Sequence, residues 1–214
     1  GMTRFLEPII GKSVYCEMTN ELFPGLTLTT TKVQAAEMPK NKIASFTTLA
    51  DGTATMILRA KEPTIICIDW KGGAHSVESY TVDDNLVTTP IQTYAGAECA
   101  VYAYSADAPL YVFSVKDAKM ENVDLSNMKQ LVLANVSGAG IDAIKLPETD
   151  TLAELILTDN NFSQLDLSRY AGQLRLLTLN NNKFTEFDAT PFKSVFSLNL
   201  ANNLLESVQL DNPE

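Results

Sequence analysis

Cysteine and histidine are scarce in this sequence, which holds three cysteines, none of them in a CxxC pair, and one histidine. A zinc site made of closely spaced cysteines is therefore not expected. The low, odd cysteine count also excludes a disulfide scaffold. Cys67 and Cys99 are compatible with a single disulfide or with two isolated thiols. We favour the thiols, because free cysteine behaves as a small buried hydrophobe.

Long hydrophobic runs and an excess of basic residues are also lacking. No stretch approaches the roughly 20 apolar residues of a membrane helix, so we expect no membrane insertion. The net charge of −10 argues against a nucleic-acid partner and against docking on anionic lipid. A hydrophobic content of 45% with 20% charged residues is typical of a globular chain, and 214 residues fit one large domain or two small ones.

Groupings of catalytic residue types are scarce as well. His75 follows Gly72-Gly73 in an expected turn, whereas a Ser-His-Asp or Cys-His relay needs a histidine held in a cleft. Asp83 and Asp84 are adjacent on an extended chain, so their side chains point to opposite faces and are expected to form a turn. We therefore expect no enzyme activity and no cofactor.

The second half of the chain contains a repeat. LAELILTDNNFSQLDLS begins at Leu152, LRLLTLNNNKFTEFDAT at Leu174 and VFSLNLANNLLESVQLD at Val195. These starts are 22 and 21 residues apart, and the apolar positions remain in phase from one copy to the next. The pattern indicates stacked structural units of one kind.

Two weaker copies precede these three. MKQLVLANV begins at Met128 and closes at Ile144 and Leu146 after a loop that is three residues longer. LYVFSVKDAKMENVDLS begins at Leu110 and places Ala118 where the later copies have asparagine. The repeat thus predicts about five coils.

These units resemble the leucine-rich repeat pattern L-x-x-L-x-L-x-x-N-x-L, with a period inside the usual range of about 20–29 residues. Leu155 and Leu157 alternate with Glu154, Ile156 and Thr158, and this period of two predicts a short parallel strand with one set of side chains pointing inward. Asn160, Asn182 and Asn203 are expected to form a structural ladder, because their amides can bond the buried backbone of a sharp turn. We expect short extended segments rather than helices after each turn.

The resemblance implies a parallel concave sheet whose outward side chains recognise a ligand. The expected ligand-binding residues are Val112, Ser114, Val132, Glu154, Ile156, Thr158, Leu176, Thr178, Asn180 and Asn199. An apolar track on this face favours recognition, although β-branched residues also occur in strands without any binding role.

One acidic or amide residue per coil precedes the asparagine position. The members of this column are Asp117, Asn135, Asp159, Asn181 and Asn202. A row of side-chain oxygens is compatible with calcium binding. Asp and Asn are also ordinary turn residues, and no GGxGxD pattern accompanies them. We favour turn chemistry and expect no metal site.

The first half has another character. ASFTTLADGTATMILRA, TIICIDW and CAVYAYS are rich in β-branched and aromatic residues and are separated by turn signals. IDWKGG followed by SYTV resembles a hairpin of PKD-like sandwich domains, which often stand directly before leucine-rich repeats in surface proteins of gut bacteria. We expect Trp70 to be a packing residue.

The sequence therefore predicts a mostly-β chain with three parts. Residues 1–42 are an uncertain segment with a strand expected at 26–33, residues 43–107 form a small PKD-like or immunoglobulin-like β-sandwich, and residues 108–214 form a leucine-rich repeat solenoid. The resemblance implies a secreted or surface-anchored bacterial protein that, like internalins, binds a protein through the concave face. Its signal peptide is expected to have been removed. The alternative is a carbohydrate-binding accessory protein, for which Trp70, Tyr80 and Tyr94 are the available aromatics. Self-association through the last coil is also expected, since no polar cap follows Leu210.

Overall fold

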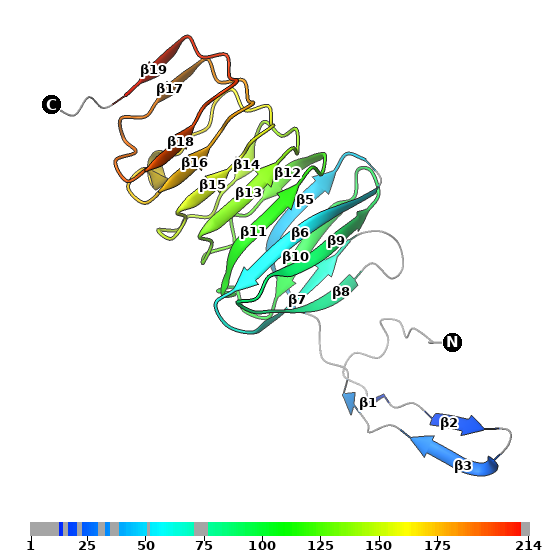
Figure 1. Ribbon diagram of the computed structural model, residues 1–214. Coiled ribbons are helices and arrows are strands. Elements are labelled where there is room, and N and C mark those ends of the chain that lie inside the picture. Colours follow the sequence, from blue (N-terminus) through cyan, green and yellow to red (C-terminus); the bar gives the residue numbers. More distant parts are fainter. Residues whose placement is uncertain are drawn as a thin grey trace. The chain divides into compact units, whose positions relative to one another are not determined.

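A computed structural model of the chain shows a mostly-β protein (Figure 1). The described residues are 13–14, 17–20, 23–29, 33–34, 39–50, 52–70 and 77–210. They fall into two units, residues 1–38 and 39–214, and each is described by itself. His75 and Cys16 lie outside the described residues.

The first unit contains two antiparallel pairs of strands. The pairs are β1 (Ser13–Val14) with β4 (Val33–Gln34), and β2 (Glu17–Asn20) with β3 (Phe23–Thr29). The strand expected at 26–33 is thus β3, which begins earlier and ends at Thr29.

The second unit is built on two sheets. The larger one, here called the front sheet, has seven strands in the order β9-β6-β11-β13-β15-β16-β18. Its strands are β9 (Val87–Thr93), β6 (Gly52–Ala60), β11 (Leu110–Lys116), β13 (Leu133–Ser137), β15 (Glu154–Ile156), β16 (Leu176–Thr178) and β18 (Ser197–Asn199). Pairing is antiparallel from β9 to β11 and parallel from β11 to β18.

The other sheet, here called the back sheet, has six strands in the order β8-β7-β10-β5-β12-β14. Its strands are β8 (Val77–Val82), β7 (Thr64–Asp69), β10 (Glu98–Ala103), β5 (Asn41–Thr48), β12 (Met120–Asp124) and β14 (Ile144–Lys145). A separate parallel pair, β17 (Glu186–Asp188) and β19 (Ser207–Gln209), belongs to the last two coils. A short 3₁₀ turn spans Ser168–Tyr170.

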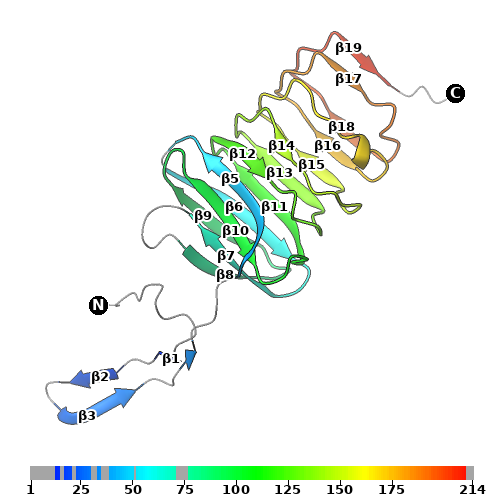
Figure 2. The same cartoon turned by 180° about the vertical axis from the view of Figure 1, so that it is seen from behind.

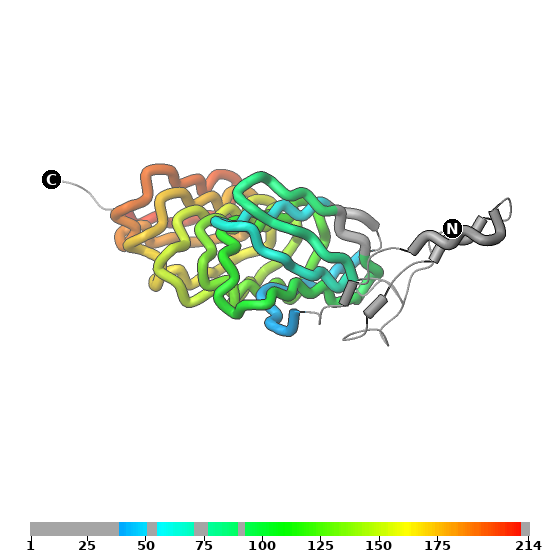
Figure 3. Tube along the Cα trace, turned by 90° about the horizontal axis from the view of Figure 1, so that it is seen from below, coloured from blue at the N-terminus to red at the C-terminus, as the bar shows by residue number. Residues whose placement is uncertain are grey.

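From β11 onward the chain is a β-solenoid of about five turns with parallel strands (Figures 1 and 2). Viewed from below, the coils follow one another as successive loops of the tube (Figure 3). Leu155, Leu177 and Leu198 are register partners in neighbouring strands and repeat one inward position. The predicted repeat is therefore a structural one.

The second coil differs from its predicted register. Leu133 pairs with Val112 and Glu154, so this coil begins at Leu131, three residues after the predicted start at Met128. The reason is the turn at Gly138, whose φ of +69° puts it in the left-handed position that aspartate or asparagine holds in the other coils. In this register Val112, Leu133 and Glu154 are each 21 residues apart, so the longer loop that the sequence predicted is not present.

Strands on both sides of residue 107 belong to the same two sheets. β6 pairs with β11, and β5 pairs with β12, in each case antiparallel. The strands expected over 43–107 thus form no sheet of their own but extend both layers of the solenoid. One hydrophobic core runs between the layers.

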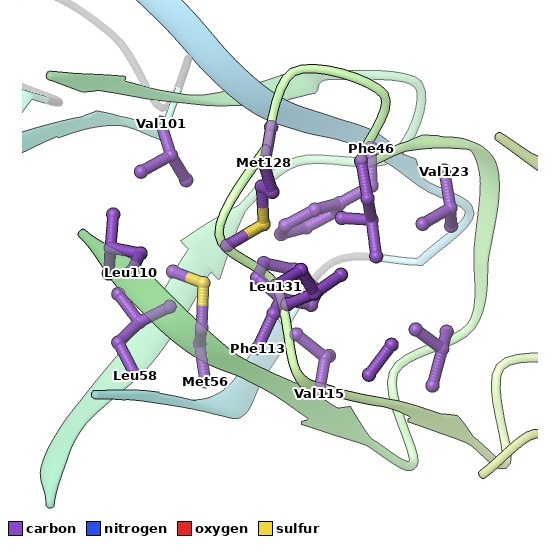
Figure 4. Packing of buried hydrophobic residues seen from close by; sticks show 14 of the residues in the cluster. Phe46, Met56, Leu58, Val101, Leu110, Phe113, Val115, Val123, Met128 and Leu131 are labelled. Carbon is purple, nitrogen blue, oxygen red and sulfur yellow. The ribbon is translucent and has the colours of Figure 1, made fainter. Parts of the chain in front are cut away.

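Figure 4 shows the core at this junction, where side chains of the two sheets meet. Phe46 and Val101 come from the back sheet, and Met56 and Phe113 from the front sheet, and all four are almost fully buried. Burying such side chains contributes roughly 1.5–3 kcal/mol each, so the junction is a continuous part of the fold.

Both described cysteines are free thiols and buried. Cys99 belongs to the core, as does Val101 two residues later on the same face of β10. Cys67 lies opposite Tyr102, whose side chain alternates to the other face, and its Sγ is 3.1 Å from Ser79 Oγ. The two thiols thus point to opposite faces of the back sheet, which is incompatible with a disulfide.

Candidate functional site

The turns after the front strands are held by buried amides. Asn182 is buried, and its Nδ2 donates to Leu157 O (2.8 Å) and Leu179 O (3.0 Å), while its Oδ1 accepts from Phe162 N (3.0 Å). Asn160 and Asn203 make the equivalent contacts in their own coils. The amides therefore tie each coil to the backbone of the preceding one and do not bond one another.

The column of acidic and amide residues just before these asparagines forms its own chain of side-chain hydrogen bonds. Asn202 Nδ2 donates to Asn181 Oδ1 (2.7 Å), and Asn181 Nδ2 donates to Asp159 Oδ1 (2.6 Å). These residues and Asp117 have φ between 55° and 57°, the left-handed conformation that Asp and Asn tolerate best. Gly138, not Asn135, completes the column. Oδ1 of Asp159 and Oδ1 of Asn181 thus accept from amides of the next coil, and the described residues hold no cluster of His, Cys, Asp or Glu that could bind a metal.

The outer surface of the front sheet, here called the front face, carries residues aligned across the strands. One row consists of Thr88, Ile57, Ser114, Asn135, Ile156, Thr178 and Asn199. The row beside it consists of Arg59, Val112, Leu133, Glu154, Leu176 and Ser197. The parallel register keeps equivalent residues adjacent, so the face is one continuous surface.

Nine of the ten residues predicted for this surface occupy positions in line with the strand register, and Val132 does not. Lys116 and Ser137 pair in a third row, and Thr158 Oγ1 donates to Asn180 Oδ1 (2.9 Å) further along it. Val132 is half-buried and precedes β13, and its N donates to Tyr111 O (2.8 Å). Its predicted place is taken by Asn135, because the register is set by the turn at Gly138.

The front face is apolar at its centre and almost uncharged. Its apolar stripe is formed by five side chains, which are Ile57, Val112, Leu133, Ile156 and Leu176. Val112 is buried and the other four are half-buried, so they lie nearly flush with the sheet. Arg59, Lys116 and Glu154 are the charged residues of the three rows. The stripe can therefore contact a flat apolar surface.

A polar cleft that the sequence did not reveal borders the front face. It encloses about 350 Å³ and is lined by Asp150, Thr151, Ala153, Gly172, Gln173, Arg175 and Ser194. Gln173 Nε2 donates to Thr149 O (2.8 Å) and Ser194 Oγ to Gly172 O (2.8 Å), which fixes its walls. The lining comes from loops of three coils, so no local motif could have indicated it.

An aromatic and charged cluster lies at the other end of the front sheet. Arg59 Nη2 bonds both the backbone and the side chain of Asp84, and its guanidinium lies 5.5 Å from the Tyr111 ring centre. Tyr111 Oη donates to Asp84 Oδ1. This hydrogen bond raises the pKa of Tyr111, which therefore remains a neutral donor. Arginine stacked on tyrosine is a combination enriched at interfaces.

Carboxylates on the opposite layer have a structural task. Asp188 Oδ1 accepts from Thr190 Oγ1 (2.7 Å) and Thr190 N (2.9 Å), and these bonds lower the pKa of Asp188. Asp166 is bonded by Ser168 in the same manner, with the same direction of pKa shift. The pattern Asp-x-Ser/Thr thus ends the second extended segment of these coils.

Comparisons of the chain with models of protein families, with curated proteins and with solved structures found no match. Within the described residues, no helix has the length and apolarity needed to cross a bilayer.

Proposed function

We propose that the chain is a non-catalytic binding module that recognises a protein partner through the front face. The observation that carries this proposal is the apolar stripe, whose five members come one from each of five neighbouring strands, in two adjacent rows of the front face. Contiguous apolar surface on a rigid scaffold is typical of recognition sites.

Rigidity supports this assignment. Each strand of the solenoid is held to its neighbour by register pairing, and the turns of coils three to five are held by a buried or half-buried asparagine. The side chains of Ile156 and Leu176 are therefore already ordered before a partner arrives. Binding then costs little conformational entropy, which favours affinity from a modest contact area.

The family assignment is part of the proposal. The coil period, the inward leucines and the turn asparagines support a leucine-rich repeat solenoid. For residues 43–107, antiparallel strands in two layers around Phe46 and Met56 support a PKD-like or immunoglobulin-like sandwich. Trp70 supports it too, since it is 2% exposed and its Nε1 donates to Glu78 Oε2 (3.3 Å). Secretion or surface attachment of a bacterial protein is proposed on the same resemblance.

Glycan binding is the weaker alternative. It needs exposed aromatic rings, and of the three available ones Trp70 is buried and Tyr80 is half-buried with its hydroxyl on Glu78. Tyr94 remains exposed in the turn after β9. Tyr104, after β10, and Phe196, before β18, are exposed as well, but each of the three rings stands in a different segment, which supports stacking on a sugar less than one shared platform would.

The test is capture of surface proteins with three forms of the chain. The parent is compared with the double variant Ile156→Lys/Thr178→Lys, which puts two charges on the front face. Ser163→Lys/Gln164→Lys is the matched control, because both residues are exposed and lie in a turn away from the front strands. All three must show the same melting temperature.

We expect a protein that is retained by the parent and the control and lost by the front-face variant. Equal retention by all three would refute the front face as the binding surface. Retention that depends on Tyr94 and is competed by soluble glycans would favour the alternative.

A further inference from the structure

The polar cleft beside the front face lies at a loop that is one residue longer than its equivalents. The loops that lead from the back layer to a front strand in the other coils span 125–131, 146–152 and 189–195, and each has seven residues. The loop at the cleft spans 167–174 and has eight. It contains the 3₁₀ turn Ser168–Tyr170. The cleft is thus found where one residue is inserted into the repeat.

Gly172 keeps this cleft open. Two residues before the start of a coil, the preceding loop has Asp150 and the following loop has Lys193, whereas this loop has glycine. Gly172 lines the cleft, and a Cβ added to it would meet no atom within 4 Å. The enclosed space of about 350 Å³ is near the lower limit of ligand clefts, which is roughly 300 Å³. It therefore has room for one side chain of a partner.

Arg175 gives the cleft a positive charge that the fold leaves unpaired. Its side chain is exposed, and no described carboxylate lies within ion-pair distance of it. Its backbone is fixed on both sides, because its N donates to Ala153 O (2.8 Å) and its O accepts from Phe196 N (3.0 Å). Asp150, the other charged residue of the lining, has its Oδ1 3.8 Å from Arg169 Nη2.

A guanidinium of this kind suits one carboxylate. Its planar fork of N–H donors matches the two oxygens of a carboxylate with two parallel hydrogen bonds. A phosphate group carries about −1.5 to −2 charges, which the single arginine of the lining does not balance. The cleft therefore favours an aspartate or glutamate side chain over a phosphorylated one.

The cleft continues into the apolar stripe. Arg175 directly precedes Leu176, which belongs to the stripe, as does Ile156 on the neighbouring strand. A partner that covers these two side chains thus reaches the arginine within one residue. The charged residues in the three rows of the face are Arg59, Lys116 and Glu154. The acidic excess of the chain, a net charge of −10, therefore lies elsewhere and does not repel a carboxylate at this place.

We propose that the polar cleft binds an aspartate or glutamate side chain of the protein partner, whose carboxylate Arg175 holds while apolar side chains of the same partner cover Leu176 and Ile156. This inference rests on the proposed function and adds the chemistry of the partner to it. The contact segment of the partner then has an acidic residue directly beside apolar ones.

The test is selection of linear peptides from a phage-displayed library on the parent chain. Enriched peptides are synthesised with both ends capped, so that only side chains carry charge, and their affinity is measured by isothermal titration calorimetry. We expect an aspartate or glutamate beside apolar residues in these peptides. Arg175→Gln should weaken their binding at least about tenfold, because the carboxylate loses its charged partner.

Three further variants make the test specific. Lys183→Gln is the matched control, since Lys183 is exposed, loses one positive charge as well and lies in the turn after β16; it should bind like the parent. Gly172→Leu fills the cleft and should weaken binding without lowering the melting temperature, because its Cβ has free space. Arg175→Glu should recover binding when the acidic residue of the peptide is replaced by lysine.

Equal binding of the peptides by the parent and Arg175→Gln would overturn the inference. So would a selection that enriches no peptide, or one that enriches apolar peptides without an acidic residue. If such apolar peptides are lost with Ile156→Ser/Leu176→Ser, the proposed function stands and this inference alone fails. Acidic peptides that need Arg175 but bind Ile156→Ser/Leu176→Ser like the parent would also overturn it, because the cleft would then act without the stripe.

Discussion

Replacing Asn182 by alanine removes the buried amide that joins two coils. The variant loses the bonds to Leu157 O (2.8 Å) and Leu179 O (3.0 Å), each about 0.5–1.5 kcal/mol net. Phe162 N loses its acceptor, Asn182 Oδ1, and is left buried, which costs about 1–3 kcal/mol. Both carbonyls keep another amide donor, so no further penalty arises from them. We expect a total loss of about 4 kcal/mol in the free energy of unfolding.

Asn203→Ala is the matched comparison, since Asn203 makes the same set of contacts one coil later. It is half-buried in the last coil, where water can replace the amide, so we expect a loss of about 1 kcal/mol. Urea unfolding followed by circular dichroism measures both losses, with the slope m compared to detect a change in cooperativity. Equal losses at the two sites, or a larger loss at Asn203, would refute the reasoning from burial.

Three further outcomes are expected. Gly138→Ala should destabilise the chain by about 2–4 kcal/mol, because φ is +69° and the new methyl would overlap Asp117 Oδ1. Gly172→Ala is the control: nothing lies near its added methyl, so it should be almost neutral in the same urea assay. The pKa of Asp188 is lower in the folded than in the unfolded chain, so its contribution to stability is present above the unfolded carboxyl pKa and is lost as the pH falls through the folded pKa. The difference in melting temperature between the parent and Asp188→Asn should therefore vanish in acid. A difference that does not depend on pH would contradict this reasoning. Burial raises the pKa of Cys99 and shields its thiol from reagents. In a Cys16→Ser background this thiol should therefore react with Ellman's reagent only as fast as the chain opens. Immediate labelling of Cys99 in the native state would argue against its core position.

Local patterns explain why the solenoid could be predicted from the sequence. Leu155 and Leu157 alternate with half-buried neighbours, and the asparagines at 160, 182 and 203 recur at the period of the coils. Each of these signals lies within a single coil, where sequence spacing translates directly into geometry. The second coil was misplaced because LVLAN imitates the repeat, while the residue that sets the turn is Gly138.

Long-range pairing explains what the sequence could not reveal. β6 pairs with β11 across a segment that itself contains β7 to β10, and no local pattern specifies such a partner. The polar cleft is lined from three separate loops, and the Arg59–Tyr111–Asp84 cluster joins two strands and a loop. Such sites depend on the packing of distant segments, so they emerge with the tertiary structure.

The central claim, recognition of a protein through the apolar stripe, is tested most directly by photo-crosslinking. A photoreactive amino acid is placed at position 156 on the front face or, in a second form of the chain, at position 164 in the exposed turn. We expect the captured protein to be crosslinked from position 156 and not from position 164. Crosslinking from position 164 alone would contradict the account and place the contact on another surface.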